Sequence, residues 1–153
     1  VETYDGALDS LRVAGVNPQG IFIGKSVALF VQLLILESVL FVAAVVLYRV
    51  QLHVDGVVLL VTCVVSATAG LSFVGTLYGG LTAGSRGRET LLPLLMLPVV
   101  APVLIGATRA TESAFNSGGA AVSDGWPWVG VLVVFAAAFG LGGILSFGSL
   151  IEE

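Results

Sequence analysis

Few side chains of this sequence are able to do chemistry, and Glu37 occupies the most informative position among them. It is an acidic residue deep inside a long apolar run. A charged group at the depth of a bilayer is costly and by default marks function. Two interpretations of Glu37 stand side by side. Either it is a polar group that faces a substrate path, or it is a protonated or hydrogen-bonded residue that holds helices together.

The histidine His53 and the cysteine Cys63 are each the only residue of their type. One cysteine can form neither an intrachain disulfide nor a CxxC redox or zinc motif. One histidine does not assemble a Ser–His–Asp or Cys–His set, and the sequence has no HExxH motif, so an intramembrane hydrolase is not indicated. We predict that His53 is a solvated loop residue, that Cys63 is a small packing residue, and that the chain holds no metal.

The segment GIFIGKS at residues 20–26 is similar to a phosphate-binding P-loop, but it is one residue shorter than GxxxxGK[ST] because position 19 is Gln. The length of that loop matters because its backbone N–H groups must surround the phosphates. The segment also leads into an apolar run. We therefore interpret Lys25 as an anchor at the membrane interface and predict that this chain does not hydrolyse ATP.

The composition predicts a chain whose exterior faces lipid. Hydrophobic residues make up 57 % of the 153 residues and charged residues 10 %, whereas an ordinary soluble domain carries about 25 % charged residues. The mean hydropathy is +1.06. The net charge of −4 and the absence of a basic stripe exclude nucleic acid as an expected partner.

The apolar runs predict an all-α, polytopic membrane bundle with about four transmembrane helices, because each run is long enough to cross a bilayer or nearly so. The distribution of Lys and Arg predicts that both chain ends are cytoplasmic. Residues 1–25 are expected to form a cytoplasmic coupling segment and residues 26–153 the membrane region. The expected spans are 26–48, 57–81, 91–107 and 128–151.

Prolines and glycines suggest how these spans are built. The third span carries Pro93, Pro98 and Pro102, which leaves a broken or re-entrant segment and a kinked helix as alternatives. Small residues at GxxxG spacing let helices approach closely, and the sequence offers a looser series on the last span that includes Gly140 and Gly143. The predicted helix-packing residues are Gly75, Gly79, Gly80 and Gly84.

The polar N-terminal segment predicts a short amphipathic helix. Leu8 and Leu11 share a helix face, Asp5 can cap the helix, and Asn17-Pro18 ends it. The alternative is a plain surface helix. We interpret the segment as a docking element, and the predicted docking residues are Asp5, Gly6, Leu8, Asp9 and Leu11.

Two segments carry a family resemblance. DGALDSL at 5–11, followed by IFIGKSVALFVQLL at 21–34, resembles the cytoplasmic loop and third helix of exporter-type ABC permeases. VGTLYGGLTAGSRGRETLLPLLMLPVVAPVLIGATRA at 74–110 is similar to CcmB, the haem exporter permease subunit of bacterial cytochrome c maturation. The shared pattern is a small-residue helix, a basic turn and a Leu-rich segment that contains Pro98 and Pro102.

The resemblance implies a multi-pass permease subunit of the bacterial inner membrane with haem as candidate cargo and no cofactor of its own. It implies a separate CcmA-like ATPase and CcmC-, CcmD- and CcmE-like partners. The family has six membrane helices, so this chain is expected to be an N-terminally truncated piece. The alternatives are a permease for another cargo, such as a lipid or drug, and a scaffold that couples ATP hydrolysis to release of a haem chaperone. Glu37, Pro98 and Pro102 mark a candidate substrate path.

Overall fold

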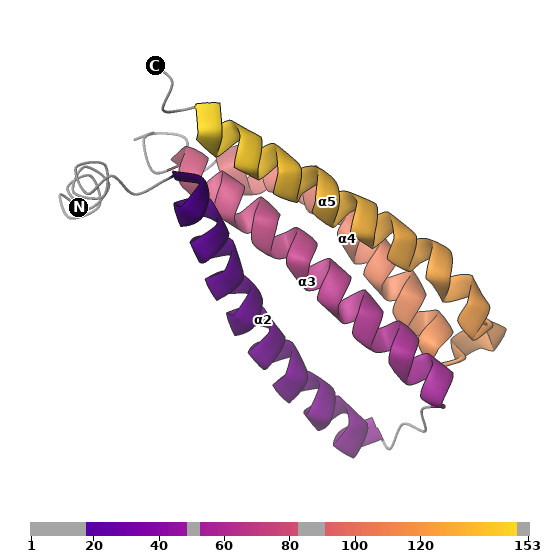
Figure 1. Ribbon diagram of the computed structural model, residues 1–153. Helices are drawn as coiled ribbons and strands as arrows, with labels where there is room; N and C mark the ends of the chain where they lie inside the picture. Colours follow the sequence, from indigo (N-terminus) through magenta and orange to yellow (C-terminus); the bar gives the residue numbers. More distant parts are fainter. Residues whose placement is uncertain (1–17, 49–52, 83–90, 150–153) are drawn as a thin grey trace.

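The computed structural model describes residues 18–48, 53–82 and 91–149, and these residues are helical apart from short connections. The described part contains no strand, so the prediction of an all-α bundle is confirmed (Figure 1). Two 3-10 turns, η1 and η2, connect α4 to α5. The elements are α2 Pro18–Tyr48, α3 Val54–Thr82, α4 Leu91–Ala114, η1 Ser117–Gly119, η2 Val122–Gly125 and α5 Trp126–Ser149.

Three stretches among the described residues are long and apolar enough to cross a membrane: Gln19–Leu47, Val54–Gly80 and Val122–Ser146. A helix satisfies its own backbone hydrogen bonds, which lipid cannot do, so such runs fold as helices. The described residues thus have the architecture of a multi-pass membrane protein.

Helix α2 begins at Pro18, eight residues before the start expected for the first span. Proline is favoured at the first helical position because its missing N–H is unpaired there in any case. The P-loop-like segment 20–26 consequently lies inside a helix and not in a loop. The side chain of Lys25 is exposed in the second turn of α2.

Helix α4 is one continuous helix although it contains Pro98 and Pro102. The broken or re-entrant alternative is therefore not observed. The helix also continues seven residues past the expected end of the span, to Ala114. The polar residues there support the helix, since the hydroxyls of Thr108 and Thr111 donate to the carbonyls of Leu104 and Ala107.

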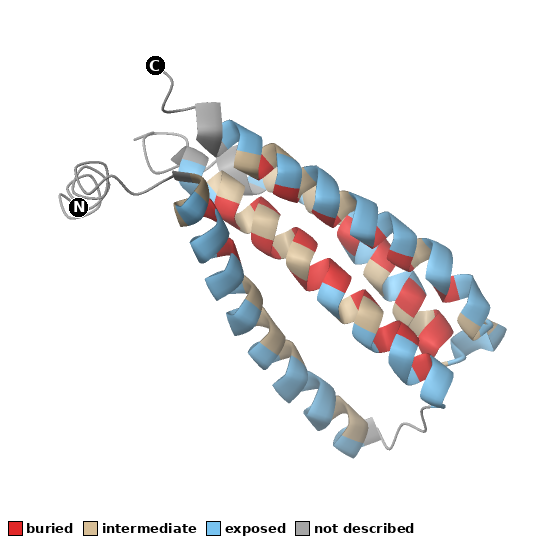
Figure 2. Cartoon of the chain, viewed as in Figure 1, coloured by how far each residue is buried: buried red, intermediate tan, exposed pale blue. Residues whose placement is uncertain are grey.

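Helix α3 lies at the centre of the bundle and packs against α2, α4 and α5, while α4 also packs against α5. In Figure 2 the buried residues concentrate on α3 and on the faces of α4 and α5 that meet it. Helix α2 contacts α3 and α5, and no contact between α2 and α4 occurs among the described residues. The core cluster consists of Leu59, Leu60, Cys63, Ala67, Val103, Ala110, Ala114, Val129 and Leu132.

Candidate functional site

The buried side of α2 carries Glu37, and its carboxylate meets α3. The hydroxyl of Thr68, a fully buried residue, donates to Glu37 Oε2 at 2.5 Å. The same hydroxyl lies 2.7 Å from the carbonyl oxygen of Val64. Thr68 has one hydroxyl proton and two close acceptors. The Glu37 carboxylate and the Val64 carbonyl therefore compete for the single hydroxyl proton of Thr68.

Thr68 belongs to a row of buried hydroxyls that follows α3. Thr68, Ser72 and Thr76 are spaced by four residues, so they lie on one face of the helix. The hydroxyls of Ser72 and Thr76 donate to the carbonyls four residues earlier at 2.7 and 2.8 Å. These bonds stay within α3. Of this row, Thr68 also contacts a side chain of α2, which makes Glu37–Thr68 a polar link between α2 and α3.

Ser26 is a second polar residue at the buried side of α2. Its side chain is 2 % exposed, and its Oγ has no hydrogen-bond partner among the described residues. One turn earlier, the ring of Phe22 stacks on Phe73 of α3 with the ring centroids 6.2 Å apart. We use the name α2–α3 seam for the polar residues Ser26, Glu37, Thr68, Ser72 and Thr76, of which all but half-buried Glu37 are buried.

The three residues of the predicted substrate path are not brought together. Glu37 lies at the α2–α3 interface, whereas Pro98 and Pro102 are exposed on α4. Helix α2 does not contact α4 in the described part of the chain. Two surface hollows are lined by α4 residues with part of the following turn, and neither includes Glu37.

The predicted packing glycines have looser surroundings than other glycines of the bundle. A Cβ on Gly75 would make an ordinary contact, 3.9 Å from Leu29 Cδ1, and a Cβ on Gly79 would meet open space. Gly80 is exposed, and Gly84 lies outside the described residues. On α5, by contrast, a Cβ on Gly143 would collide with the Phe22 ring, and one on Gly140 would lie 3.1 Å from Phe73.

His53 is exposed before the first turn of α3, and Cys63 is buried in the core. The Sγ of Cys63 donates weakly to the carbonyl oxygen of Ala107 at 3.8 Å. The described residues contain no group of three or more His, Cys, Asp or Glu side chains that could hold a metal ion. The predicted docking residues Asp5, Gly6, Leu8, Asp9 and Leu11 lie outside the described residues.

Comparison with known protein families gives one match that covers most of the chain. The family model described as "CcmB protein" matches residues 1–142, which is nearly the whole sequence. The chain belongs to the CcmB family. No curated protein and no solved structure matches it. The resemblance to CcmB that we noted at residues 74–110 is thus confirmed, and the match extends over a much longer part of the chain.

Sequence reasoning identified Glu37 but missed its partner Thr68 and the buried Ser26. The hydroxyl spacing of α3 was a usable signal, since Thr68, Ser72 and Thr76 recur every four residues in an apolar run. Nothing in the sequence pattern predicted that Glu37 pairs with Thr68, because the two residues are 31 positions apart in the chain.

Proposed function

We propose that this CcmB chain is a permease subunit of a haem-exporting ABC transporter that serves cytochrome c maturation in the bacterial inner membrane. The observation that carries the proposal is the family match over residues 1–142. The described helices agree with it, since three of them have the length and composition of membrane spans.

ATP hydrolysis is assigned to a separate CcmA-like subunit. The P-loop-like segment of this chain is part of α2, where its backbone follows the helix and cannot wrap around a phosphate. The segment before α2, with Leu8 and Leu11, is the proposed docking element for that ATPase. CcmC-, CcmD- and CcmE-like proteins are the further proposed partners.

The α2–α3 seam is the proposed location of the path for cargo or for the conformational change that moves it. Support comes from Glu37, an acidic residue at membrane depth that is linked to a buried hydroxyl. Pro98 and Pro102 lie on the outer face of α4, so the proposed path follows α2 and α3 without them.

The deciding experiment is haem flux into vesicles that contain this subunit together with its ATPase and the other partners. ATP-dependent accumulation of haem inside the vesicles supports the permease. Release of haem-loaded chaperone without any flux would instead identify a coupling scaffold. ATP-dependent accumulation of a lipid or drug without haem would identify a permease for another cargo.

The role of Glu37 is tested in cells that lack their own CcmB and depend on this chain for haem-stained c-type cytochromes. Glu37→Leu is expected to lower cytochrome c maturation, whereas Glu37→Gln, which keeps a hydrogen-bonding side chain, is expected to retain more of it. Ser38→Ala is the control, because Ser38 is an exposed neighbour whose hydroxyl bonds within α2. Equal maturation in Glu37→Leu and Ser38→Ala would contradict a functional seam.

A further inference from the structure

The outer face of α4 carries an ion pair at the end of an apolar stripe. The guanidinium Nη1 of Arg109 lies 3.2 Å from Oε2 of Glu112, and the two side chains remain 60 % and 45 % exposed. Along the same helix, Leu97, Leu104 and Ile105 are 64 %, 56 % and 54 % exposed. An exposed pair of opposite charges therefore follows directly on a surface of large apolar side chains.

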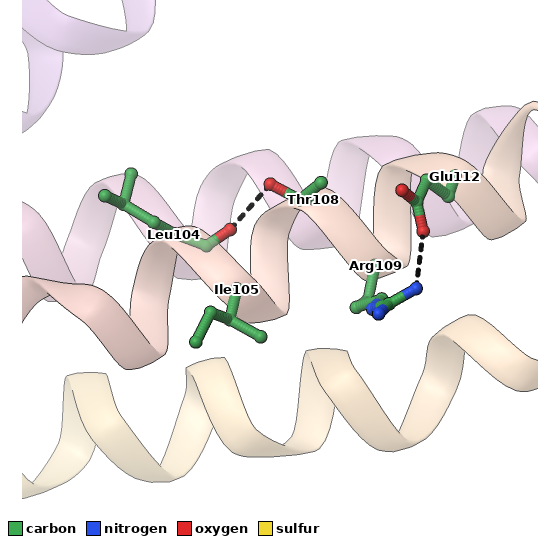
Figure 3. A pocket seen from close by; sticks show the side chains of 5 residues that line it. All are labelled: Leu104, Ile105, Thr108, Arg109 and Glu112. Atoms are coloured by element: carbon green, nitrogen blue, oxygen red, sulfur yellow. Dashed lines mark hydrogen bonds and ion pairs between the residues drawn. The ribbon is translucent and has the colours of Figure 1, made fainter.

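Leu104, Ile105, Thr108, Arg109 and Glu112 together line a shallow hollow, which we call the α4 hollow. Figure 3 shows Ile105 and Arg109 on the same side of α4, with Glu112 reaching across to Arg109. The hydroxyl of Thr108 donates to the carbonyl of Leu104 and not to the carboxylate of Glu112. The hollow is apolar towards the middle of α4 and charged towards the end of the helix.

The depth of the ion pair can be read from the tryptophans that begin α5. Trp126 and Trp128 open that helix, and tryptophan is enriched where a membrane meets water. A Cβ on Gly106 would lie 3.6 Å from the carbonyl oxygen of Trp128, so these two residues are level. Arg109 lies about one turn beyond Gly106. By this criterion we expect the ion pair at the height of the lipid headgroups and the apolar stripe at the height of the acyl chains.

The order of the charges also matches a headgroup. Arg109 is nearer the middle of the membrane, and Glu112 lies about 4.5 Å further out along the helix axis. In phosphatidylethanolamine the phosphate is attached next to the glycerol, and the ammonium lies beyond it. The contact between Arg109 and Glu112 uses one guanidinium nitrogen and one carboxylate oxygen. A guanidinium has five N–H donors and a carboxylate has two acceptor oxygens, so both groups keep capacity for a ligand.

We propose that the α4 hollow binds a zwitterionic phospholipid with a primary ammonium group, namely phosphatidylethanolamine. Arg109 donates to the phosphate, Glu112 accepts from the ammonium, and one acyl chain lies along Leu104 and Ile105. Phosphatidylcholine has a quaternary ammonium without an N–H donor, and phosphatidylglycerol has no ammonium. The site therefore discriminates among lipids by the hydrogen bond to Glu112.

The proposal is tested by native mass spectrometry of the purified full chain in detergent. The chain is mixed with equal amounts of phosphatidylethanolamine, phosphatidylcholine and phosphatidylglycerol that carry identical acyl chains. We expect phosphatidylethanolamine to be retained about fivefold more than either competitor, the effect of one headgroup-level charge contact. Equal retention of the three lipids would overturn the proposal and leave the face to bulk lipid or to a protein helix.

Three variants assign the effect to the ion pair. Glu112→Gln should remove the preference for phosphatidylethanolamine over phosphatidylglycerol, and Arg109→Gln should lower retention of all three lipids. The double exchange Arg109→Glu with Glu112→Arg keeps both charges but reverses their order, so it should also lose the preference. Asp55→Asn is the control, because Asp55 is an exposed acid at the same end of the bundle, in the first turn of α3.

The contrary outcomes are equally distinct. A phosphatidylethanolamine preference that survives in Glu112→Gln and in the double exchange would overturn the site. So would a loss of preference in Asp55→Asn that equals the loss in Glu112→Gln. A dimer of the chain that disappears in Arg109→Gln would show that a second copy, and not a lipid, covers the hollow.

Discussion

Helix α2 and the unit formed by α3, α4 and α5 are built from similarly apolar residues but are packed very differently. None of the most apolar 18-residue stretch of α2 is buried, whereas 44 % of the corresponding stretch of α3 is. Figure 1 shows α2 leaning away from α3, with the separation increasing towards the C-terminal end of α2. In the described part of α2, the buried residues are Phe22 and Ser26. Half-buried Glu37 adds a hydrogen bond further along.

This contrast shows that an apolar composition suits a helix to the membrane but does not by itself pack the helix against its neighbours. Lipid is as apolar as a leucine side chain, so helix association depends on close packing and on polar contacts. The α3–α4–α5 unit has both a contiguous core and tight glycine contacts. Helix α2 is attached by the Phe22 ring at one end and by Glu37 in its second half. Helix α2, which packs less closely than the other helices, is therefore also the helix that carries Glu37.

The largest effect should come from the core of the α3–α4–α5 unit. Leu132→Ala removes a side chain that is 1 % exposed, and we expect it to lower the free energy of unfolding by about 2–5 kcal/mol. Leu141→Ala, on the same helix but 63 % exposed, should change it by less than about 0.5 kcal/mol. Both are measured by unfolding in mixed micelles. Equal effects would contradict the contrast between buried and lipid-facing leucines.

The next effect concerns the attachment of α2 at Phe22. Gly143→Ala places a methyl group where the Phe22 ring lies, and overpacking of this kind costs about 1–3 kcal/mol. Gly130→Ala, also on α5, meets open space and should be neutral or stabilising, because alanine favours helices by up to about 1 kcal/mol over glycine. Gly143→Ala should therefore lower the temperature of thermal unfolding, whereas Gly130→Ala should leave it unchanged or raise it. A parallel shift would show that the Phe22 contact does not hold α2.

A smaller effect is expected at the segment that precedes α2. If that segment docks the ATPase, Leu8→Ala combined with Leu11→Ala should weaken binding of the ATPase by about tenfold, because buried apolar anchors dominate interface energy. Ser10→Ala in the same segment is the control. Co-purification and titration with the ATPase measure the effect. Unchanged affinity in the leucine double variant would make the segment a plain surface helix.

The smallest effect should come from the Glu37–Thr68 link. Interhelical hydrogen bonds in membranes average about 0.6 kcal/mol and reach at most about 1.7 kcal/mol. A double-mutant cycle of Glu37→Leu and Thr68→Val should give a coupling energy in this range. Thr62→Val is the control, because the Thr62 hydroxyl bonds within α3 to Val58. A coupling energy of zero would leave Phe22 as the contact that holds α2 to its neighbours.

The helical class and the position of Glu37 inside a long apolar run could be predicted from the sequence alone. Composition and run length determine these features. A chain with 10 % charged residues has too few of them to form the polar surface of a soluble domain. A long apolar run in lipid must form its backbone hydrogen bonds within itself, which a helix does. The same local reasoning did not show that the helix of the third predicted span continues past 107 to Ala114, because the polar residues that follow still fit a helix.

The faces by which the helices pack against one another could not be predicted from the sequence. The helices are apolar nearly all round, so the periodicity that marks a buried face in a soluble helix is absent. It was therefore not predictable that Glu37 pairs with Thr68, that Pro98 and Pro102 face outward, or that Phe22 fills the space beside Gly143. Each of these facts depends on how helices that are separate in the sequence pack against one another. How two helices pack depends on the shapes of the side chains of both, so the sequence of one helix alone does not determine it.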